Sequence, residues 1–425
     1  MKRRVVVTGM GVIAPNANGL GAFDAALRST KSGLRTVDFM VKHGFACTVG
    51  GVPEGVEELA KSLFTEEELL AMNAIHRYAA IASVEAWADA GLPRPKFGDE
   101  HVNWDTGAVL GTGIGGMDTV GDRVVPLVND NKVKRLGSTS VEQVMASGLS
   151  ARVSGILALG NQVTTNSSAC ATGAEAIAMG VERIRAGLAE RMLCGGAEVP
   201  TPYNWAGFDA MRVLNRKHND APEAASRPLS ASAGGFIPGA GAGVVIVESL
   251  DAARARGARI HAEVLGAATN CGGHRGGGSM TAPNPEGVRR CISAAIADAG
   301  IATSEVDAIS GHLTATGADP REVASWSAAL GRGPESFPWI TSTKSLIGHT
   351  LGAAGALESI AAVLMLRGGY VHGSINCEDV HPEIAPFAAS IPHETRTLPG
   401  LRTIMKAGFG FGDVNAALVL RKWND

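Results

Sequence analysis

Short apolar runs alternate with Ala-rich helical patterns along the whole of this 425-residue chain. Strands that alternate with helices are typical of an α/β fold with mostly parallel sheets. The sequence therefore predicts that fold class. The expected strands lie at 4–9, 106–111, 161–165, 191–196, 243–248, 260–265, 308–311, 339–343, 403–408 and 416–421, and the clearest helices at 77–90, 174–186, 285–299 and 355–366.

The two halves of the chain repeat one pattern. Cys170-x-x-Gly173 opens one helical pattern, and His349-x-x-Gly352 opens another in a matching position. A coincidence between two common helix starts is the alternative. If the duplication is real, both helix starts could meet in one site between the halves.

The boundary between the halves is then expected near 251–258. This predicts an N-terminal half, residues 1–255, that carries the cysteine. The C-terminal half, residues 256–425, would carry the two histidines.

Cys170 is the candidate nucleophile. It stands between a strand-like run that ends at Thr165 and a helix of small residues. A thiol at the start of a helix lies near the positive end of its dipole, which favours the thiolate. Small neighbours leave the sulfur accessible and let backbone N–H groups approach a bound acyl oxygen. A buried core cysteine is the alternative, but the setting is that of a nucleophile elbow with Cys in place of Ser.

Two of the eleven histidines, His312 and His349, lie in matching Gly- and Thr-rich settings at expected strand ends or helix starts. Lys344 precedes His349 by five residues. A cysteine with two histidines suits acyl transfer through a thioester. Neutral imidazoles can donate Nε2–H hydrogen bonds to a developing enolate, and Lys344 could set the electrostatics.

The run 406–415 alternates glycines with Phe409 and Phe411. Such a segment can approach a substrate closely, supply backbone N–H groups to an oxyanion, and swing as a gate. A Gly-rich hairpin turn explains it equally well. The Gly-rich segment around His274 is read as a loop near the substrate entrance rather than as a ligand site.

Composition excludes several classes of protein. Hydrophobic residues make up 45% of the chain and the net charge is −3, so we expect a packed globule without a global nucleic-acid footprint. Six cysteines are scattered without a CxxC pair, which indicates neither a zinc site nor a disulfide framework. The sequence shows no signal-peptide pattern and no run of 18 apolar residues, so a cytoplasmic protein without a membrane span is expected.

With these residues identified, the chain resembles the beta-ketoacyl-ACP synthases of the synthase I/II type, within the thiolase-like superfamily. The similarity covers nearly the whole length. It rests on five ordered motifs, at 5–12, 111–116, 168–173, 344–355 and 410–415.

The resemblance implies a duplicated thiolase-like fold, layered α-β-α-β-α with two mixed sheets, in an obligate homodimer. A heterodimer with a related subunit is the other possibility. The implied reaction is a decarboxylative Claisen condensation. Cys170 would take an acyl chain from acyl carrier protein, and His312 and His349 would stabilise the enolate that forms when malonyl-ACP loses CO2. No cofactor is expected beyond the phosphopantetheine of the carrier protein, and no metal.

The resemblance also assigns further residues. Lys344 matches the family's active-site lysine. Thr314 and Thr316 match threonines that bind the phosphopantetheine arm, and Phe411 matches the gating phenylalanine whose N–H joins that of Cys170 in the oxyanion hole. A second gate residue, a pocket phenylalanine and a tunnel-end residue are expected at Phe409, Phe208 and Ile114.

The expected partner is an acidic carrier protein, so we look for a basic rim. The candidates are Lys132, Lys134, Arg135 and Arg212, with Arg77 a weaker one. An ordinary solvated lysine face is the alternative.

The chain departs from the family pattern at several places. The usual glycine after the first histidine is Leu313, the usual Thr-Pro segment is Thr316-Gly317, and the spacing from His312 to Asp319 is one residue short. Gly239–Gly243 lacks the usual acid, Asp413 replaces a gate glycine, and the charges of the loop that starts at Arg227 are missing. The loss of these charges together suggests that one buried ion network was removed as a unit. Our hypothesis is a specialised condensing enzyme, for example one that elongates unsaturated chains for a pigment or polyene.

Three other interpretations of the sequence are possible. A non-catalytic chain-length factor shares the fold but usually lacks the cysteine. A thiolase needs a second cysteine near the gate, and a synthase III-type enzyme uses a Cys-His-Asn triad. The sequence leaves the choice between housekeeping fatty-acid elongation and a secondary-metabolite ketosynthase open.

Overall fold

The strands confirm the alternating pattern, because every expected strand lies in or overlaps an observed one. The computed structural model describes residues 2–96 and 98–424. Its strands are β1 (Val5–Ala14), β2 (Ala17–Asn18), β3 (Leu34–Thr36), β4 (Val49–Gly51), β5 (Thr106–Gly111), β6 (Val163–Thr164), β7 (Arg191–Glu198), β8 (Gly241–Ser249), β9 (Ala262–Cys271), β10 (Ala308–Ser310), β11 (Trp339–Thr341), β12 (Tyr370–Val371), β13 (Arg396–Thr397), β14 (Thr403–Gly410) and β15 (Val414–Lys422).

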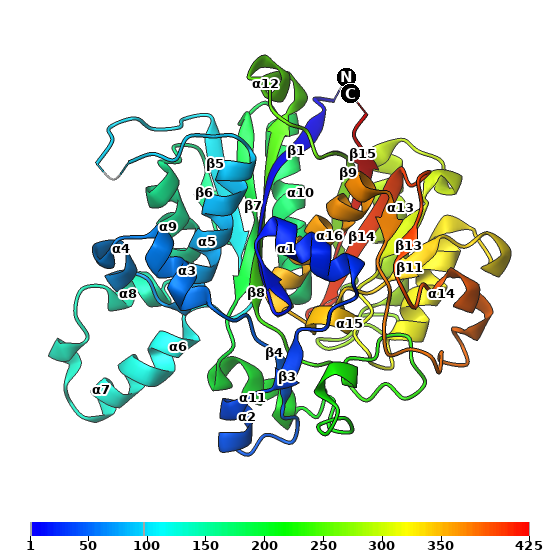
Figure 1. The fold of residues 1–425 in the computed structure, drawn as a ribbon, viewed down its shortest axis with the longest axis horizontal. Coiled ribbons are helices and arrows are strands. Elements are labelled where there is room, and N and C mark those ends of the chain that lie inside the picture. The colour runs from blue at the N-terminus through cyan, green and yellow to red at the C-terminus, as the bar shows by residue number, and fades with distance from the viewer. Residues whose placement is uncertain (1, 97, 425) are drawn as a thin grey trace.

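The four expected helices are also present, and the longest ones pack on the sheet (Figure 1). The helices are α1 (Leu20–Arg28), α2 (Asp38–Lys42), α3 (Val56–Leu63), α4 (Glu66–Leu70), α5 (Ala74–Asp89), α6 (Met117–Thr119), α7 (Val125–Asn129), α8 (Ser140–Val144), α9 (Gly148–Leu157), α10 (Thr172–Arg185), α11 (Pro202–Ala210), α12 (Leu250–Ala255), α13 (Pro285–Ala299), α14 (Asp319–Leu330), α15 (Lys344–Ile347) and α16 (Ala354–Gly368).

The duplication is visible in the order of the strands. The first half is ordered β6-β5-β7-β8-β1 and the second β11-β10-β14-β15-β9, so each reads 3-2-4-5-1 when its own strands are numbered along the chain. The directions match as well: strands 2, 3 and 4 of each half are parallel, and strands 5 and 1 add antiparallel pairs. The two expected sheets are joined where β1 pairs with β9 at two positions, which makes one hydrogen-bonded sheet.

The prediction of mostly parallel sheets is wrong, because half of the neighbouring pairs in each half are antiparallel. The reason is clearest at β14 and β15. Only Phe411–Asp413 separates these strands, and a connection that short permits antiparallel pairing alone. The sequence already contained this signal, since no helical pattern fits between 403–408 and 416–421.

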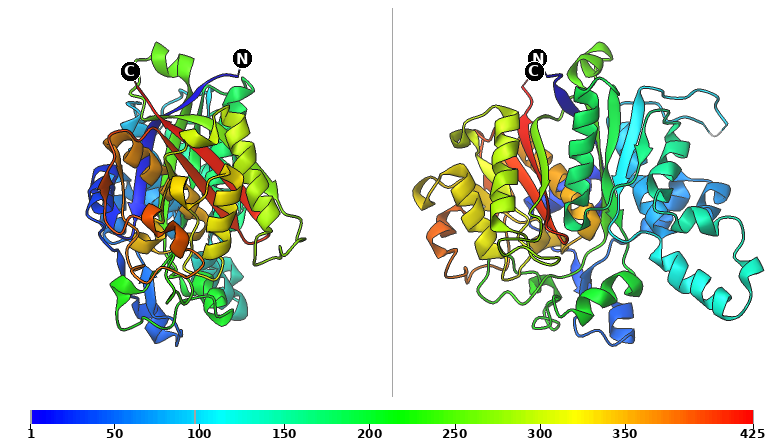
Figure 2. Two further views of the ribbon diagram at one scale, coloured as in Figure 1. Left: turned by 90° about the vertical axis from the view of Figure 1, so that its right-hand side faces the viewer. Right: turned by 180° about the vertical axis from the view of Figure 1, so that it is seen from behind.

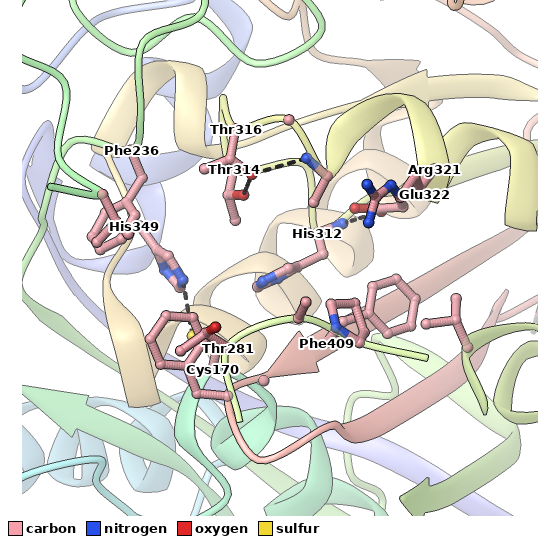
Figure 3. A pocket seen from close by; sticks show the side chains of 18 of the residues that line it. Cys170, Phe236, Thr281, His312, Thr314, Thr316, Arg321, Glu322, His349 and Phe409 are labelled. Atoms are coloured by element: carbon pink, nitrogen blue, oxygen red, sulfur yellow. Dashed lines mark hydrogen bonds between the residues drawn. The ribbon is translucent and has the colours of Figure 1, made fainter. Parts of the chain in front are cut away.

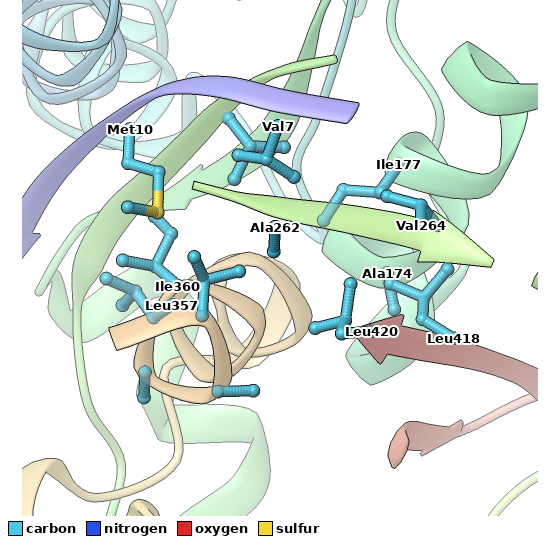
Figure 4. Close-up of a cluster of buried hydrophobic side chains, with 14 of the residues drawn as sticks. Val7, Met10, Ala174, Ile177, Ala262, Val264, Leu357, Ile360, Leu418 and Leu420 are labelled. Carbon is cyan, nitrogen blue, oxygen red and sulfur yellow. The ribbon is translucent and has the colours of Figure 1, made fainter. Parts of the chain in front are cut away.

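Helices and sheet halves alternate in five layers (Figure 2). The three largest clusters of buried apolar side chains among the described residues lie between these layers. The central cluster joins α10 and α16 to the facing sides of the two sheet halves, and Figure 4 shows Ile177, Leu357, Val264 and Leu418 meeting in it. The second cluster lies under α5 and α9, and the third under α13 and α14. Both faces of each sheet half are therefore covered, as expected for strands that read as continuous apolar runs.

The N-terminal ends of α10 and α16 come unusually close together. A Cβ atom added at Gly173 would lie 2.5 Å from the backbone nitrogen of Ala356, and one at Gly355 would lie 2.4 Å from that of Ala174. Glycine is required at both positions because any side chain would push the helices apart. The two helix starts therefore converge, as the repeated Cys-x-x-Gly and His-x-x-Gly patterns predicted.

Among the residues that the structure describes, one segment, Leu351–Gly368, is long and apolar enough by composition to cross a membrane. Of its 18 residues, 89% are buried inside the protein, as is typical of a core helix. The central position of α16 in the layered fold accounts for its composition.

Candidate active site

Cys170 lies in a tight turn that leads into α10. The turn Ala169–Ala171 is a single 3₁₀ turn, and Ala169 adopts a left-handed φ of 48°. A non-glycine residue in that region is strained, which is characteristic of a nucleophile elbow. The side chain of Thr172 accepts a hydrogen bond from the Ser168 backbone and donates to Ala169, so the turn is fixed from within.

His349 lies between α15 and α16 and faces the cysteine. Its backbone pairs with 237–239, where its N–H donates to Ile237 and its carbonyl accepts from Gly239. Its Nδ1 accepts a hydrogen bond from the Leu351 N–H at 3.2 Å, which leaves the ring proton on Nε2. Nε2 lies 3.0 Å from Cys170 Sγ.

His312 follows the end of β10. The carboxylate of Glu322 on α14 accepts hydrogen bonds from the N–H groups of His312 and Leu313 at 2.6 and 2.7 Å, which fixes this segment. His312 Nδ1 lies 3.4 Å from Lys344 Nζ. An ammonium group has donors but no acceptor, so Nδ1 is the acceptor here and the ring proton is again on Nε2.

Both imidazoles and the thiol face one cavity of about 510 Å³ (Figure 3). The rings of His312 and His349 meet edge to face with centroids 5.3 Å apart. Phe236, which sequence reasoning missed, packs edge to face on His349 at 5.2 Å. Nothing in the sequence around Phe236 distinguishes it from a core residue.

Burial controls the protonation states. Burial and the charge of Lys344 hold the pKa values of both His312 and His349 well below the usual histidine range, and Lys406 adds to this effect. Both rings are therefore neutral at physiological pH, and each presents an Nε2–H donor to the cavity.

The expectation that the helix dipole favours a Cys170 thiolate needs correction. Burial raises the pKa of Cys170 to about 11, and the charge of Lys344 and the Phe411 N–H only partly offset it. The free thiol is therefore protonated at pH 7. The sequence pattern locates the helix terminus correctly but carries no measure of how far the sulfur is removed from water.

A buried ion group behind the histidines was missed by sequence reasoning. Glu358 on α16 bridges two lysines: one oxygen contacts Lys344 Nζ, and the other lies 2.7 Å from Lys406 Nζ on β14. All three residues are at most 1% exposed. A signal was present, since Glu358 is the one acid in an apolar helix and Lys406 the one charge in an apolar strand.

The two candidate gate residues lie at the end of β14 and just after it. Phe409 and Phe411 line the cavity, and Phe409 packs edge to face on His312 at 6.0 Å. Asp413 adopts a left-handed φ of 61° where the family pattern has glycine. Its buried carboxylate accepts hydrogen bonds from the N–H groups of His274 and Asn284 at 3.0 and 2.7 Å, which ties the gate to the loop around His274.

Three of the four expected substrate contacts line the cavity. Thr314 and Thr316 lie side by side with their hydroxyl oxygens 2.9 Å apart, and Phe208 packs 6.2 Å from Phe411. Ile114 does not line it and is 36% exposed on the chain surface. The tunnel-end role of Ile114 therefore has no support within one chain.

The departures from the family pattern are accommodated locally. Leu313 has a φ of 27° and is fully buried, with its N–H bound by Glu322. Asp319 accepts hydrogen bonds from the N–H groups of Leu229 and Thr314. Arg227 has an ion-pair partner in Asp379 at 3.2 Å, so the residue that remains from the altered loop is not an orphaned charge.

The candidate docking residues do not form one patch on this chain. Arg212 is exposed and adjoins Met211, which lines the cavity. Lys132, Lys134 and Arg135 are exposed after α7, which Figure 1 places at the outer end of an arm away from α15. Arg77 is engaged with Glu57. An exposed cation that sequence reasoning missed, Arg321, lies at the cavity itself.

The spacing of residues indicated no metal-ligand cluster, yet the fold brings three possible ligand atoms together. Those of Cys170, His312 and His349 lie within 4.8 Å of one another. These three groups come from separate segments, which is why spacing did not reveal them. Thiolate and imidazole ligands suit Zn²⁺, but the net positive charge of Lys344, Glu358 and Lys406 opposes a cation there.

Comparisons with known proteins agree on one family. Residues 2–253 match the family model described as Beta-ketoacyl synthase, N-terminal domain, and residues 261–378 match Beta-ketoacyl synthase, C-terminal domain. The chain is 35% identical to 3-oxoacyl-[acyl-carrier-protein] synthase 1 of Haemophilus influenzae, over 99% of this chain and 100% of that protein. It is 34% identical to 3-oxoacyl-[acyl-carrier-protein] synthase 1 of Escherichia coli K12, with full coverage of both.

Solved structures give the same result. A beta-ketoacyl synthase from Burkholderia phymatum STM815 superposes with a TM-score of 0.90 at 29% identity. The ishigamide ketosynthase/chain length factor gives 0.89 at 30% identity, and each comparison covers 100% of both chains. A type II PKS acyl-carrier protein in complex with its ketosynthase gives 0.86 at 28% identity, again with full coverage.

Proposed function

The chain belongs to the beta-ketoacyl synthase family and is a condensing acyltransferase, and from this premise we propose how its own residues divide the reaction. Cys170 accepts an acyl group from acyl carrier protein. His312 and His349 then stabilise the enolate formed from malonyl-ACP, and the product is a 3-oxoacyl-ACP. One observation carries this proposal: a thiol and two neutral Nε2–H donors from three separate segments face one cavity.

The first half-reaction moves an acyl group from one sulfur to another. Cys170 Sγ attacks the thioester carbonyl, the bond to the carrier thiol breaks, and the Cys170 proton ends on that thiol. Two backbone N–H groups support the tetrahedral oxyanion. They are the N–H of Phe411, which lowers the pKa of the Cys170 thiol, and the N–H of Cys170 itself. A Cβ atom at Gly410 would lie 3.1 Å from the Cys170 nitrogen. Glycine at this position therefore lets the gate strand approach the elbow.

The second half-reaction begins when malonyl-ACP loses CO2 and the electron pair of the broken bond forms an enolate. The Nε2–H groups of His312 and His349 donate to the enolate oxygen. The enolate carbon then attacks the acyl thioester, the bond to Cys170 breaks, and the sulfur leaves as thiolate. This thiolate takes up one proton from water, which regenerates the resting thiol. No oxidant or reductant is needed, and we propose that the reaction uses no cofactor and no metal.

The carrier arm is proposed to enter past Thr314 and Thr316. Their hydroxyl groups suit the amides of phosphopantetheine, and Arg321 provides a cation at the cavity without an ion pair of its own among the described residues. We propose Arg212 as the docking residue nearest the cavity. Lys132, Lys134 and Arg135 would serve the partner subunit's cavity if two copies pair as a homodimer.

We keep the division into residues 1–255 and 256–425 as a proposal, supported by the repeated strand order on either side of α12. We also propose a cytoplasmic location. The acyl preference is proposed to be specialised, since the gate carries Asp413 and the loop after Arg227 differs from the family pattern.

The competing readings lose support. A chain-length factor is not favoured, because Cys170 is in contact with His349. A thiolase would need a second cysteine in the cavity. Cys271 contacts the Gly412 carbonyl near the gate but does not line the cavity.

The test is intact mass spectrometry after incubation with saturated and polyenoic acyl-ACPs, with Cys170→Ala as the control. We expect acyl adducts on the wild type only, then chain extension when malonyl-ACP is added. Preference for polyenoic donors would support the specialised role, and comparable rates on ordinary saturated donors would count against it. No adduct from any donor would refute the proposal for this chain alone.

A further inference from the structure

Lys406 is a buried charge to which the reaction described above gives no role. It lies on β14, three residues before Phe409, and its side chain is fully buried. A lysine is buried only where it is paired, because removing an ammonium group from water is costly. Its partner is Glu358, with Nζ and Oε2 2.7 Å apart, and Nζ also donates to the Ala407 carbonyl.

The charges in this group do not cancel. Lys344 and Lys406 each carry a positive charge and share the single carboxylate of Glu358, one on each oxygen. The group therefore has a net charge of +1. With Lys406 on Oε2, Lys344 is confined to Oε1, on the side where it reaches His312.

The position of Lys344 matters because its Nζ lies 3.4 Å from His312 Nδ1. This contact puts the His312 ring proton on Nε2. His349 obtains the same tautomer from a backbone N–H of Leu351. Only His312 therefore depends on a side chain for its tautomer, and that side chain depends on how Glu358 is shared.

We propose that Lys406 is a positioning residue of the condensation: it occupies the second oxygen of Glu358, holds Lys344 against His312 Nδ1, and so keeps His312 a neutral Nε2–H donor. This inference rests on the proposed function and deepens it. Lys406 acts through Glu358 and Lys344 and contacts no substrate.

The charges around His312 support this role. The titratable groups around it are Lys344, Glu358, Lys406, His349, Glu322 and the thiol of Cys170. Positive charge opposes protonation, and the pKa of His312 is held well below its usual range by burial, Lys344, His349 and Lys406 in that order. Removing the Lys406 charge therefore moves the pKa of His312 upward. Burial likewise lowers the pKa of Lys406 itself, while Glu358 opposes that shift.

The test is Lys406→Met, which keeps the stem and removes the charge. Glu358 and Lys344 then form a neutral pair, so the variant is expected to fold. Lys422→Met, on the neighbouring strand β15, is the matched control. Two rates are measured: acylation of Cys170 by acyl-ACP, and decarboxylation of malonyl-ACP.

We expect the decarboxylation rate to fall by about 10- to 100-fold. Complete loss of one oxyanion donor reduces a rate by about 10²–10³-fold, which sets the upper limit of this effect. Acylation and the KM for malonyl-ACP should stay within about threefold of wild type. An equal loss of both rates would overturn the inference, because it would indicate structural damage alone. Wild-type values for both rates would also overturn it.

A second readout is the nitrogen NMR signature of labelled histidines. In the wild type, His312 should remain neutral and Nε2-protonated through the pH range in which an ordinary histidine titrates, because its pKa is held well below that range. In Lys406→Met it should titrate at a higher pH than in the wild type or change tautomer. An unchanged titration would overturn the inference. Failure of the wild type to decarboxylate malonyl-ACP would instead refute the proposed function, so the two failures are distinguishable.

Discussion

Replacing Glu358 with glutamine tests the buried ion group directly. The change keeps the volume of the side chain but leaves Lys344 and Lys406 buried with no carboxylate between them. Breaking a buried ion pair by removing one partner costs about 3–5 kcal/mol. The variant can limit this cost if one lysine gives up its proton, which restores the original net charge of +1.

The cost of that deprotonation depends on pH in a defined way. With an unfolded-state lysine pKa of about 10.4, it is about 4.6 kcal/mol at pH 7 and about 1.9 kcal/mol at pH 9. The folded variant binds fewer protons than its unfolded chain, so its stability rises with pH. The difference in unfolding free energy between wild type and variant must therefore become smaller as the pH rises.

The assay is thermal unfolding of both proteins at pH 7 and pH 9. For 425 residues, the unfolding entropy is about 0.9 kcal/mol/K, so the Tm loss should be about 5 °C at pH 7 and about 2 °C at pH 9. Glu182→Gln, an exposed acid on α10, is the control and should change the Tm by under about 1 °C. If Glu358→Gln does not lower the Tm, or lowers it equally at the two pH values, the reasoning is refuted.

Two further predictions concern the elbow. Gly355→Ala places a Cβ atom 2.4 Å from the Ala174 nitrogen and should cut the acylation rate of Cys170 by about 100-fold, because the helix starts separate. Gly155→Ala is the control, since a Cβ atom there meets nothing within 4 Å. Equal acylation rates in the two variants would contradict the account. Since the pKa of Cys170 is raised to about 11, its alkylation by iodoacetamide should accelerate about tenfold per pH unit from pH 7 to 9. Peptide mass spectrometry separates this signal from that of exposed Cys271, and a plateau below pH 8 would show that the thiolate is already formed.

The candidate catalytic residues could be located from the sequence because each is marked by its own neighbours. Cys170 and His349 open small-residue helices, and His312 ends an apolar strand, so local patterns locate them and the duplication predicts that they meet. Glu358 and Lys406 were not predicted, because their partnership depends on a helix and a strand that face each other only in the folded protein.

The predictions of a Cys170 thiolate and of mostly parallel strands failed for related reasons. A helix start indicates where a dipole points but not how much water the fold excludes from the sulfur. Alternation of strands and helices indicates an α/β protein but not the β14–β15 hairpin, which is set by the length of the connection.

The most direct test of the account separates the two half-reactions with His312→Ala. His312 is close to Lys344 and His349, but only His349 has a ring nitrogen in contact with Cys170 Sγ. The account predicts that this variant still forms the acyl adduct on Cys170, within about threefold of the wild-type rate, and loses malonyl-ACP decarboxylation by about 10²–10³-fold. Decarboxylation at the wild-type rate, or an equal loss of both half-reactions, would contradict it.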